Sequence, residues 1–280
     1  MNEYLLDLFL PIYYYENLEI LCFINIVLSI ACFIYFQWHP LKFGPLVFSG
    51  QKSINQRLLS DKLCVSLTNL IPLLFFVPFV ITTEQSQGPF TFPYLFFIGI
   101  HLYRGTYYSY ARSKHSSPWP LPTFLFTLIQ RCVVAFIAAI SATYGLVSYQ
   151  SSIFNGILKI ALFVLVYLQV KEDLSLTRLR FVGQKGYKPV TGGMYKYVGS
   201  PSLLYELIIW ILWGILLEVN IGTIAIWFWL IPTVYERAVN RHRWMHRTFK
   251  GQISPYQTPI IPFININALF RILASSLEFM

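Results

Sequence analysis

Seven apolar stretches, each near the length that crosses a lipid bilayer, limit the possible folds of this chain more than any other feature. A helix needs about 20 apolar residues to span the hydrocarbon core. The stretches are 18–36, 63–81, 90–110, 121–148, 153–170, 203–218 and 222–239. The sequence therefore predicts an all-α fold, a polytopic membrane protein of about seven transmembrane helices, in a single membrane domain over residues 1–280.

The composition supports the membrane class and excludes several others. Charged residues make up 12% of the chain and hydrophobic residues 56%, whereas a soluble domain carries about 25% charged residues. A disordered chain, a coiled coil and an ordinary soluble enzyme are therefore excluded. The cysteines lie in apolar stretches without a CxxC pair, so neither a disulfide nor a zinc site is expected. No Lys or Arg precedes the first apolar run, which is unlike a signal peptide.

The basic residues predict the orientation of the chain. The net charge is +9, and 18 of the 21 Lys and Arg residues fall in segments 37–62, 111–120, 171–202 and the region after 236. The loops that alternate with these segments carry none. Since cytosolic loops are enriched in Lys and Arg, the alternation predicts a lumenal N-terminus and a cytosolic C-terminus. The positive charge thus reports membrane topology, and no nucleic acid partner is expected.

Ionisable residues inside the expected spans are candidates for function, because charge is costly there. His101 and Arg104 lie three residues apart and share one face of the third helix. For them we favour a buried polar role over snorkelling of Arg104 to the head groups. For Arg131 and Lys159 two interpretations have about equal weight. Each side chain either only snorkels or pairs locally, or it has a functional role.

Segment 171–202 joins glycines to Arg and Lys, a combination that suits either lipid head groups or a phosphate-bearing ligand. No GxGxxG follows a strand and no Walker motif is present, so a soluble dinucleotide-binding domain is not supported. His242 and His246 are four residues apart, but their neighbours are Arg, so no metal site is expected. A basic membrane-surface helix and a dinucleotide anion site remain alternatives there.

Glu206 follows the sequence Ser200–Pro201–Ser202 at the start of the sixth stretch. A serine before or beside a proline predicts a capped helix start. A glutamate in the first turns also stabilises the helix dipole without any further role. The functional alternative is a buried carboxylate beside a cofactor.

Several motifs in order resemble the steroid 5α-reductase family. Residues 192–215 resemble its C-terminal signature, in which Gly-Gly and Tyr-Val precede a helix with Glu206 and Trp210. Residues 237–245, RAVNRHRWM, and the closing Ile-Pro-Phe at 261–263 resemble two further motifs. Residues 173–180 and HLYRGTYYS at 101–109 resemble two earlier ones, the latter in either of two registers one residue apart. The resemblance covers residues 95–264.

The resemblance implies a seven-helix enzyme of the endoplasmic reticulum membrane that uses NADPH. Such an enzyme reduces a carbon–carbon double bond conjugated to a carbonyl in a lipid, either a steroid, a polyprenoid or an enoyl lipid. The family's cofactor contacts carry over to residues that suit diphosphate, ribose and adenine. They are Arg104, Asp173, Arg180, Tyr187, Lys188, Ser202, Glu206, Arg237 and His242.

The chain departs from the family at the catalytic pair. Asn69 stands near the family's glutamate of the second span, and the family's tyrosine of the third span falls on His101 or Leu102. Asn69 and His101 are therefore the candidate catalytic residues, as hydrogen-bond donors to a carbonyl. The loss of the usual pair leaves a non-catalytic, lipid-binding relative as an alternative.

A membrane methyltransferase of the isoprenylcysteine type is a weaker alternative. That family favours Arg-His-Pro before its helix, where this chain has Gly199–Ser200–Pro201. A cavity into which Asn69 and His101 point would favour catalysis, whereas aromatic side chains that fill it would count against catalysis.

Overall fold

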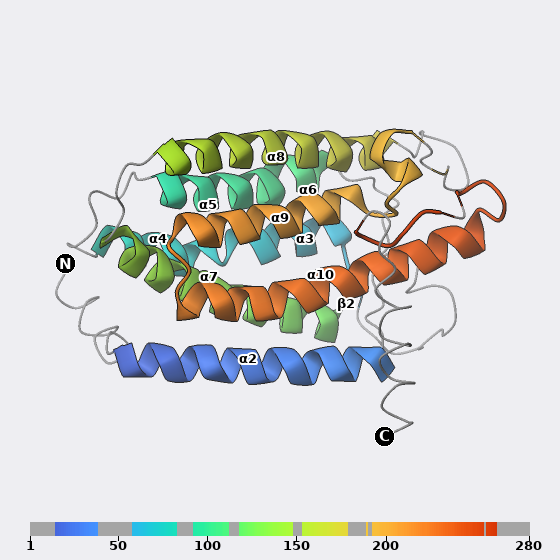
Figure 1. The fold of residues 1–280 in the computed structure, drawn as a ribbon. Helices are drawn as coiled ribbons and strands as arrows, with labels where there is room; N and C mark the ends of the chain where they lie inside the picture. The colour runs from blue at the N-terminus through green and yellow to red at the C-terminus, as the bar shows by residue number, and fades with distance from the viewer. Residues whose placement is uncertain are drawn as a thin grey trace, which may run out of the picture.

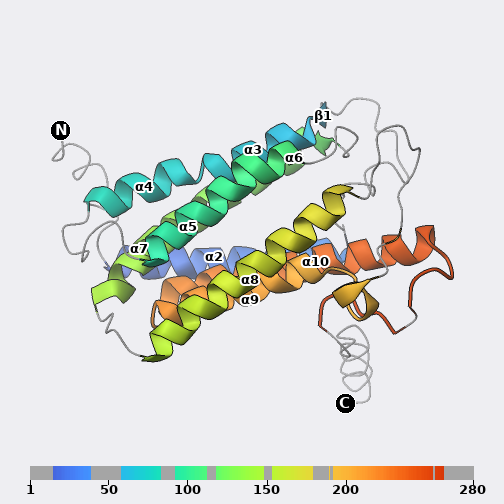
Figure 2. The ribbon, with the colours of Figure 1, turned by 90° about the horizontal axis from the view of Figure 1, so that it is seen from above.

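All seven expected apolar stretches are helical in the computed structural model, which describes residues 15–38, 58–82, 92–111, 118–147, 153–178, 189, 192–254 and 256–261. Successive stretches run in opposite directions (Figures 1 and 2). In order they are α2 (Tyr15–Trp38), α3 (Asp61–Leu70) with α4 (Leu73–Thr82), α5 (Phe92–Tyr103) continued by the π-helix η3 (Arg104–Tyr108) and α6 (Ser109–Ala111), α7 (Leu121–Val147), α8 (Ile153–Arg178), α9 (Pro201–Leu216) and α10 (Ile221–Thr248).

Three of these stretches are long and apolar enough to cross a membrane. They are Asp61–Pro78, Leu121–Ala142 and Ile153–Leu176, and two shorter apolar helices cover Leu18–Cys32 and Pro201–Leu216. The outer faces of α2 and α8 expose many large apolar side chains, as a lipid-facing surface does. A helical fold with candidate membrane spans is therefore confirmed, whereas the count of seven spans and the orientation of the termini stay predictions.

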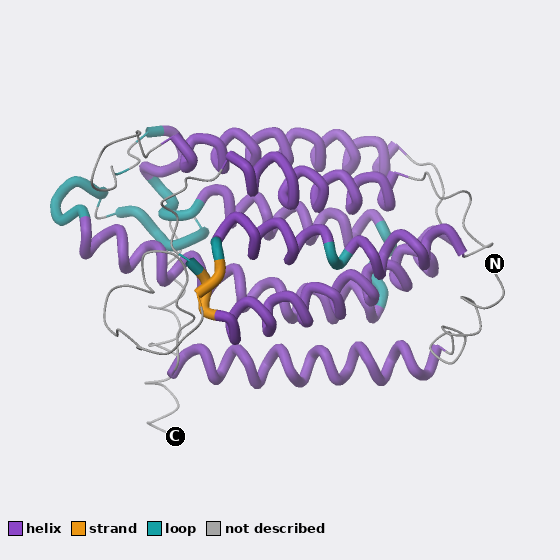
Figure 3. The backbone as a smooth tube through the Cα atoms, turned by 180° about the vertical axis from the view of Figure 1, so that it is seen from behind, coloured by secondary structure: helices purple, strands orange, loops and turns teal. Residues whose placement is uncertain are grey.

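Non-helical elements are short in the described residues. Strands β1 (Leu58–Leu59) and β2 (Trp119–Pro120) pair antiparallel beside α3 and α7 (Figure 3). The 3-10 helix η4 (Gly193–Lys196) leads into α9, and Val198 bridges to Thr258 beyond α10. This bridge holds the segment after α10 against the start of α9.

Polar side chains tie the helices together inside the apolar core. Asn25 Nδ2 donates to the carbonyl of Ala225 at 3.0 Å, which joins α2 to α10. Gln130 Nε2 donates to Asn25 Oδ1 at 2.9 Å and brings in α7. Trp213 Nε1 donates to the carbonyl of Pro93 at 3.2 Å and joins α9 to α5. Such interhelical hydrogen bonds are directional. They help to determine which helices pack together, which apolar burial alone does poorly.

Two local expectations differ from the structure. The fifth apolar stretch is expected to end at residue 170, but α8 continues without interruption to Arg178. Ser200 is the N-cap residue of α9, yet its side chain makes no capping hydrogen bond. At α10, by contrast, Asn220 and Thr223 form a reciprocal capping box.

Gly214 allows α9 and α10 to approach closely. A Cβ at this position lies 2.5 Å from the ring of Trp227, whose Nε1 donates to the carbonyl of Trp210 at 3.0 Å. Since that ring is held, we expect Gly214→Ala to lower the unfolding free energy by about 1–3 kcal/mol. Thermal unfolding in detergent measures the loss. The control is Gly99→Ala in α5, where an added Cβ meets nothing within 4 Å; an equal loss there would contradict the packing argument.

Candidate active site

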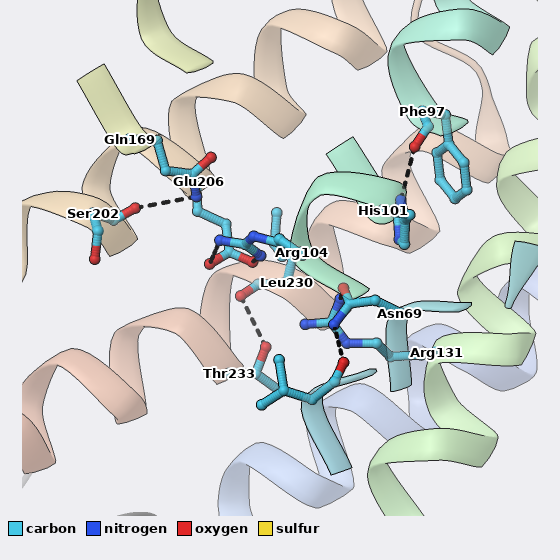
Figure 4. Close-up of polar contacts among 11 residues, drawn as sticks. Asn69, Phe97, His101, Arg104, Arg131, Gln169, Ser202, Glu206, Leu230 and Thr233 are labelled. Carbon is cyan, nitrogen blue, oxygen red and sulfur yellow. Dashed lines mark hydrogen bonds and ion pairs between the residues drawn. The ribbon is translucent and has the colours of Figure 1, made fainter. Parts of the chain in front are cut away.

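A bidentate ion pair joins the third and sixth apolar stretches. Arg104 Nη1 donates to Glu206 Oε1 at 2.6 Å, and Nη2 donates to Oε2 at 3.0 Å. The side chain of Glu206 is 3% exposed and that of Arg104 is 13% exposed. Figure 4 shows the two planar groups face to face between their helices. Two residues that the sequence names separately as cofactor contacts, 102 positions apart, therefore form one buried unit.

A π-helical turn presents Arg104 at this point. η3 begins at Arg104, directly after α5, and such turns occur frequently at functional sites. Gly105 is buried against α3, and a Cβ there would lie 2.7 Å from the side chain of Leu70. The close contact sets the position of Arg104 relative to Asn69, one residue before Leu70.

Asn69, a predicted catalytic residue, uses both ends of its amide within the protein. Its Nδ2 donates to the carbonyl of Val65 at 2.7 Å, and its Oδ1 accepts from Arg131 Nη1 at 3.4 Å. Figure 4 shows Arg131 reaching from α7 to Asn69, beside the Arg104–Glu206 pair. The amide oxygen of Asn69 thus positions Arg131, and the amide nitrogen is bound to the main chain of its own helix.

His101, the second predicted catalytic residue, is enclosed by aromatic rings. Its Nδ1 lies 2.9 Å from the carbonyl of Phe97, which makes Nδ1 the protonated nitrogen. The imidazole stacks on Phe97 with ring centroids 4.2 Å apart, and Trp210 meets it edge-on at 5.8 Å. The side chain is buried, and its Nδ1–H donates to the carbonyl of Phe97 in its own helix.

The cytosolic end predicted for the bundle gathers buried polar atoms that lack a hydrogen-bond partner among the described residues. Around the start of α9 these are Tyr195 Oη and Ser200 Oγ, and across from them Arg241 Nη1, His242 Nδ1 and Gln257 Oε1. The last two lie beside Gly199, within 3.1 Å and 3.4 Å of a Cβ placed there. Buried polar atoms are normally satisfied, so a ligand with polar groups is a natural partner for this cluster.

The remaining sequence-predicted contacts divide into two groups. Asp173 and Ser202 are buried, and the carbonyl of Ser202 accepts from Gln169 Nε2 at 3.5 Å. Arg237 is half-buried on α10 and lies within electrostatic reach of Glu206. Three further predicted contacts lie outside the described residues: Arg180, Tyr187 and Lys188.

Sequence reasoning passed over three members of this region. For Arg131 the sequence gives snorkelling and a functional role equal weight, although a charge inside an apolar stretch favours a role in function. Tyr195 lies within the family-like signature but carries no charge to mark it. Gln257 follows the last helix, and only the fold brings it to Tyr195, whose carbonyl accepts from Gln257 Nε2 at 2.6 Å.

The described residues hold no group of three metal-ligating side chains. His242 and His246 lie with ring centroids 4.3 Å apart. Two imidazoles alone do not complete the three or four ligands that a zinc site uses.

Acidification is expected to destabilise the protein through His242. Burial, followed by the neighbouring His246, lowers the pKa of His242 from 6.5 to about 4. Between these two values the unfolded chain binds a proton that the folded one does not, so the unfolding free energy falls as the pH drops. Thermal unfolding at several pH values measures this loss, and His242→Gln should show a shallower dependence. Parallel profiles for the two proteins would contradict the assignment.

Comparisons with known proteins identify the family of the chain. The model of the family described as 3-oxo-5-alpha-steroid 4-dehydrogenase matches residues 121–265, just over half of the chain. The chain is 26% identical over 99 residues to "Steroid 5-alpha-reductase DET2" of Arabidopsis thaliana, which is 35% of this chain and 37% of that protein. It is 27% identical over 97 residues to "3-oxo-5-alpha-steroid 4-dehydrogenase 1" of Rattus norvegicus, again 35% of this chain and 37% of the relative.

The curated relatives are thus matched over little more than a third of their own length. The matched family region contains Arg131, Glu206, Arg237 and His242, and so holds most of the polar groups described above. This chain belongs to the steroid 5α-reductase family, as a distant member.

Proposed function

We propose that the chain is an NADPH-dependent reductase of a carbon–carbon double bond conjugated to a carbonyl in a lipid, acting in the endoplasmic reticulum membrane. Family membership supports an oxidoreductase, and relatives are named for steroid reduction. The observation that carries the proposal is the buried Arg104–Glu206 pair next to the cluster of unpartnered polar atoms around the start of α9. A steroid is the first substrate class to test, followed by polyprenoid and enoyl lipids.

The residues at the cytosolic end fit the polar half of NADPH. The unpartnered Arg241 Nη1 and Ser200 Oγ suit phosphate oxygens, and Tyr195 Oη and His242 Nδ1 suit ribose or adenine. Arg237 lies within electrostatic reach of Arg241, and the predicted contact Asp173 within electrostatic reach of Tyr195. When bound, NADPH would supply the hydride that reduces the double bond.

The protein's own contribution is to hold charged side chains in fixed positions and to exclude water. Glu206 holds the guanidinium of Arg104 through two hydrogen bonds, so neither side chain needs to reorganise during a reaction. Aromatic rings of α5 and α9, Phe97 and Trp210, lie against His101 beside the pair and contribute apolar surface there. A carbonyl oxygen that gains negative charge during reduction requires a donor nearby.

A specific observation favours the second candidate function, a non-catalytic lipid-binding relative. Phe97 and Trp210 pack directly on His101, and the donors of His101 and Asn69 are engaged by main-chain carbonyls. If these two residues had to donate to a substrate, the site would be inactive as it stands. The reductase therefore requires another electrophilic group.

Direct binding of NADPH to the purified protein in detergent tests the proposal. We expect Arg237→Ala and Arg241→Ala each to weaken binding about 10- to 100-fold, because each removes a charge-assisted contact. Lys196→Ala is the matched control, an exposed basic residue of η4 outside the polar cluster. Failure of the folded wild-type protein to bind NADPH would contradict the reductase, and an equal loss in Lys196→Ala would contradict the site.

A further inference from the structure

Arg131 lies at the centre of a candidate membrane span. The span within α7 runs from Leu121 to Ala142, so Arg131 is the eleventh of its 22 residues. A charge at the middle of a span is costly and faces the bundle interior or a binding site. Lys159 contrasts with it, since that residue lies near the beginning of its own span and reaches the ring of Phe92, 5.7 Å from the centroid.

No carboxylate of the described residues forms an ion pair with Arg131. The ion pair recorded there joins Arg104 to Glu206 and occupies both oxygens of Glu206. Arg131 instead donates to the neutral Oδ1 of Asn69 at 3.4 Å, whereas charge-assisted bonds measure about 2.7–2.9 Å. The guanidinium therefore keeps most of its capacity to bind an anion.

The charges around Arg131 also favour an anion. Arg104 and Arg237 lie within electrostatic reach of Glu206 together with Arg131, and Asp173 lies within electrostatic reach of Arg104. Among these described residues, three guanidinium groups face two carboxylates. A site with an excess of one sign attracts the opposite charge, most strongly where water is excluded.

The donors next to Arg131 are directed elsewhere. Asn69 Nδ2 donates to the carbonyl of Val65, and the Nδ1 of His101 is engaged by the carbonyl of Phe97. Arg131 thus carries a positive charge at this point, and its donors are committed neither to its own helix nor to a carboxylate (Figure 4).

We propose that Arg131, positioned by Asn69, forms an oxyanion-binding site inside the membrane domain for a lipid that carries a carboxylate or a carbonyl that becomes negatively charged. The inference deepens the proposed function, and its catalytic purpose rests on that function. Arg131 then takes the role for which the sequence nominated Asn69 and His101. The predicted ligand is an apolar chain or ring system with its oxygen at α7.

Binding of dodecanoate and of its neutral analogue dodecanamide tests the site without turnover. Thermal unfolding in detergent, at a pH where the acid is ionised, reports the affinity of each compound. We expect dodecanoate to bind the wild-type protein more tightly than dodecanamide. We expect Arg131→Gln to weaken dodecanoate binding about 10- to 100-fold, because a hydrogen-bonded charge pair is lost. Arg131→Lys keeps the charge and should retain part of the preference.

Two further variants separate the site from general effects. Asn69→Asp places a carboxylate on Arg131 and should abolish the preference for dodecanoate while it leaves a paired, folded core. Lys159→Gln removes a charge from another span and should change nothing. Equal binding of acid and amide to the wild-type protein, or equal losses in Arg131→Gln and Lys159→Gln, would overturn the inference.

NADPH binding, measured on the same proteins, separates this inference from the proposed function. Arg131→Gln should bind NADPH as the wild-type protein does. Charge-dependent dodecanoate binding without NADPH binding would support the oxyanion site and contradict the reductase. NADPH binding without any preference for the acid would overturn the oxyanion site alone.

Discussion

Glu206→Ala should lower the unfolding free energy by about 3–5 kcal/mol, the loss that follows when one partner of a buried ion pair is removed. The side chain is 3% exposed and is bound to Arg104 through both oxygens. Its removal leaves Arg104 without its counterion. It also removes the negative charge that offsets the positive charges of Arg131 and Arg237. Denaturant or thermal unfolding in detergent measures the effect.

A double variant distinguishes a broken pair from a simple loss of packing. Arg104→Met combined with Glu206→Leu replaces both charges by apolar groups, which buried pairs tolerate far better than a single deletion. It should be more stable than Glu206→Ala. Glu218→Gln, which changes an exposed carboxylate after α9, should stay within about 0.5 kcal/mol of the wild-type protein. Additive losses in the double variant would contradict the coupling of Arg104 and Glu206.

Arg131→Gln should slow the reduction of a steroid enone about 100- to 1000-fold, the usual cost of removing an oxyanion donor. If the proposed function holds, hydride addition to the β carbon shifts the electron pair of the carbon–carbon double bond to between the α carbon and the carbonyl carbon, and the π pair of the carbonyl moves to its oxygen. Arg131 stabilises the resulting enolate, and the α carbon then takes a proton. The consumption of NADPH with time measures the rate.

The pattern of constants identifies the role of Arg131. The KM for NADPH should not change, because the loss concerns the transition state and not the cofactor. Arg131→Lys should recover part of the rate, since it restores a charge without the planar guanidinium. A rate in Arg131→Gln equal to that of Lys159→Gln would show that the guanidinium takes no part in the reaction.

The positions of the helices were predictable because hydrophobic length is a local property of the sequence. Most of the expected apolar stretches form helices within a few residues of their predicted bounds, as α7 does at 121–147 against the expected 121–148. The exceptions are α8 and α10, which continue to Arg178 and Thr248, beyond the expected ends at 170 and 239. Arg104 is marked by its place inside an apolar stretch, where charge is rare, whereas Glu206 is marked by its place after Ser200–Pro201–Ser202 at the start of a helix. Their membership of one site followed from the family resemblance.

The partners of these residues were not predictable. Arg104 was expected to contact a cofactor, but the structure gives it Glu206 as its partner. Asn69 and His101 were nominated as donors, and their donors turn to Val65 and Phe97, one helical turn earlier. The hydrogen-bond partner of a buried polar group depends on how the helices pack, and the sequence pattern does not predict this packing.

The π-turn of η3 bears on how this chain is related to its family. An α-helix that gains one residue can take it up as a local π-turn, while the residues before and after keep their original faces. The third stretch would therefore tolerate the insertion or deletion of a single residue between Arg104 and Tyr108 without losing its packing on α3. A one-residue difference in spacing within HLYRGTYYS can therefore be taken up at η3 without turning the faces that α5 and α6 present.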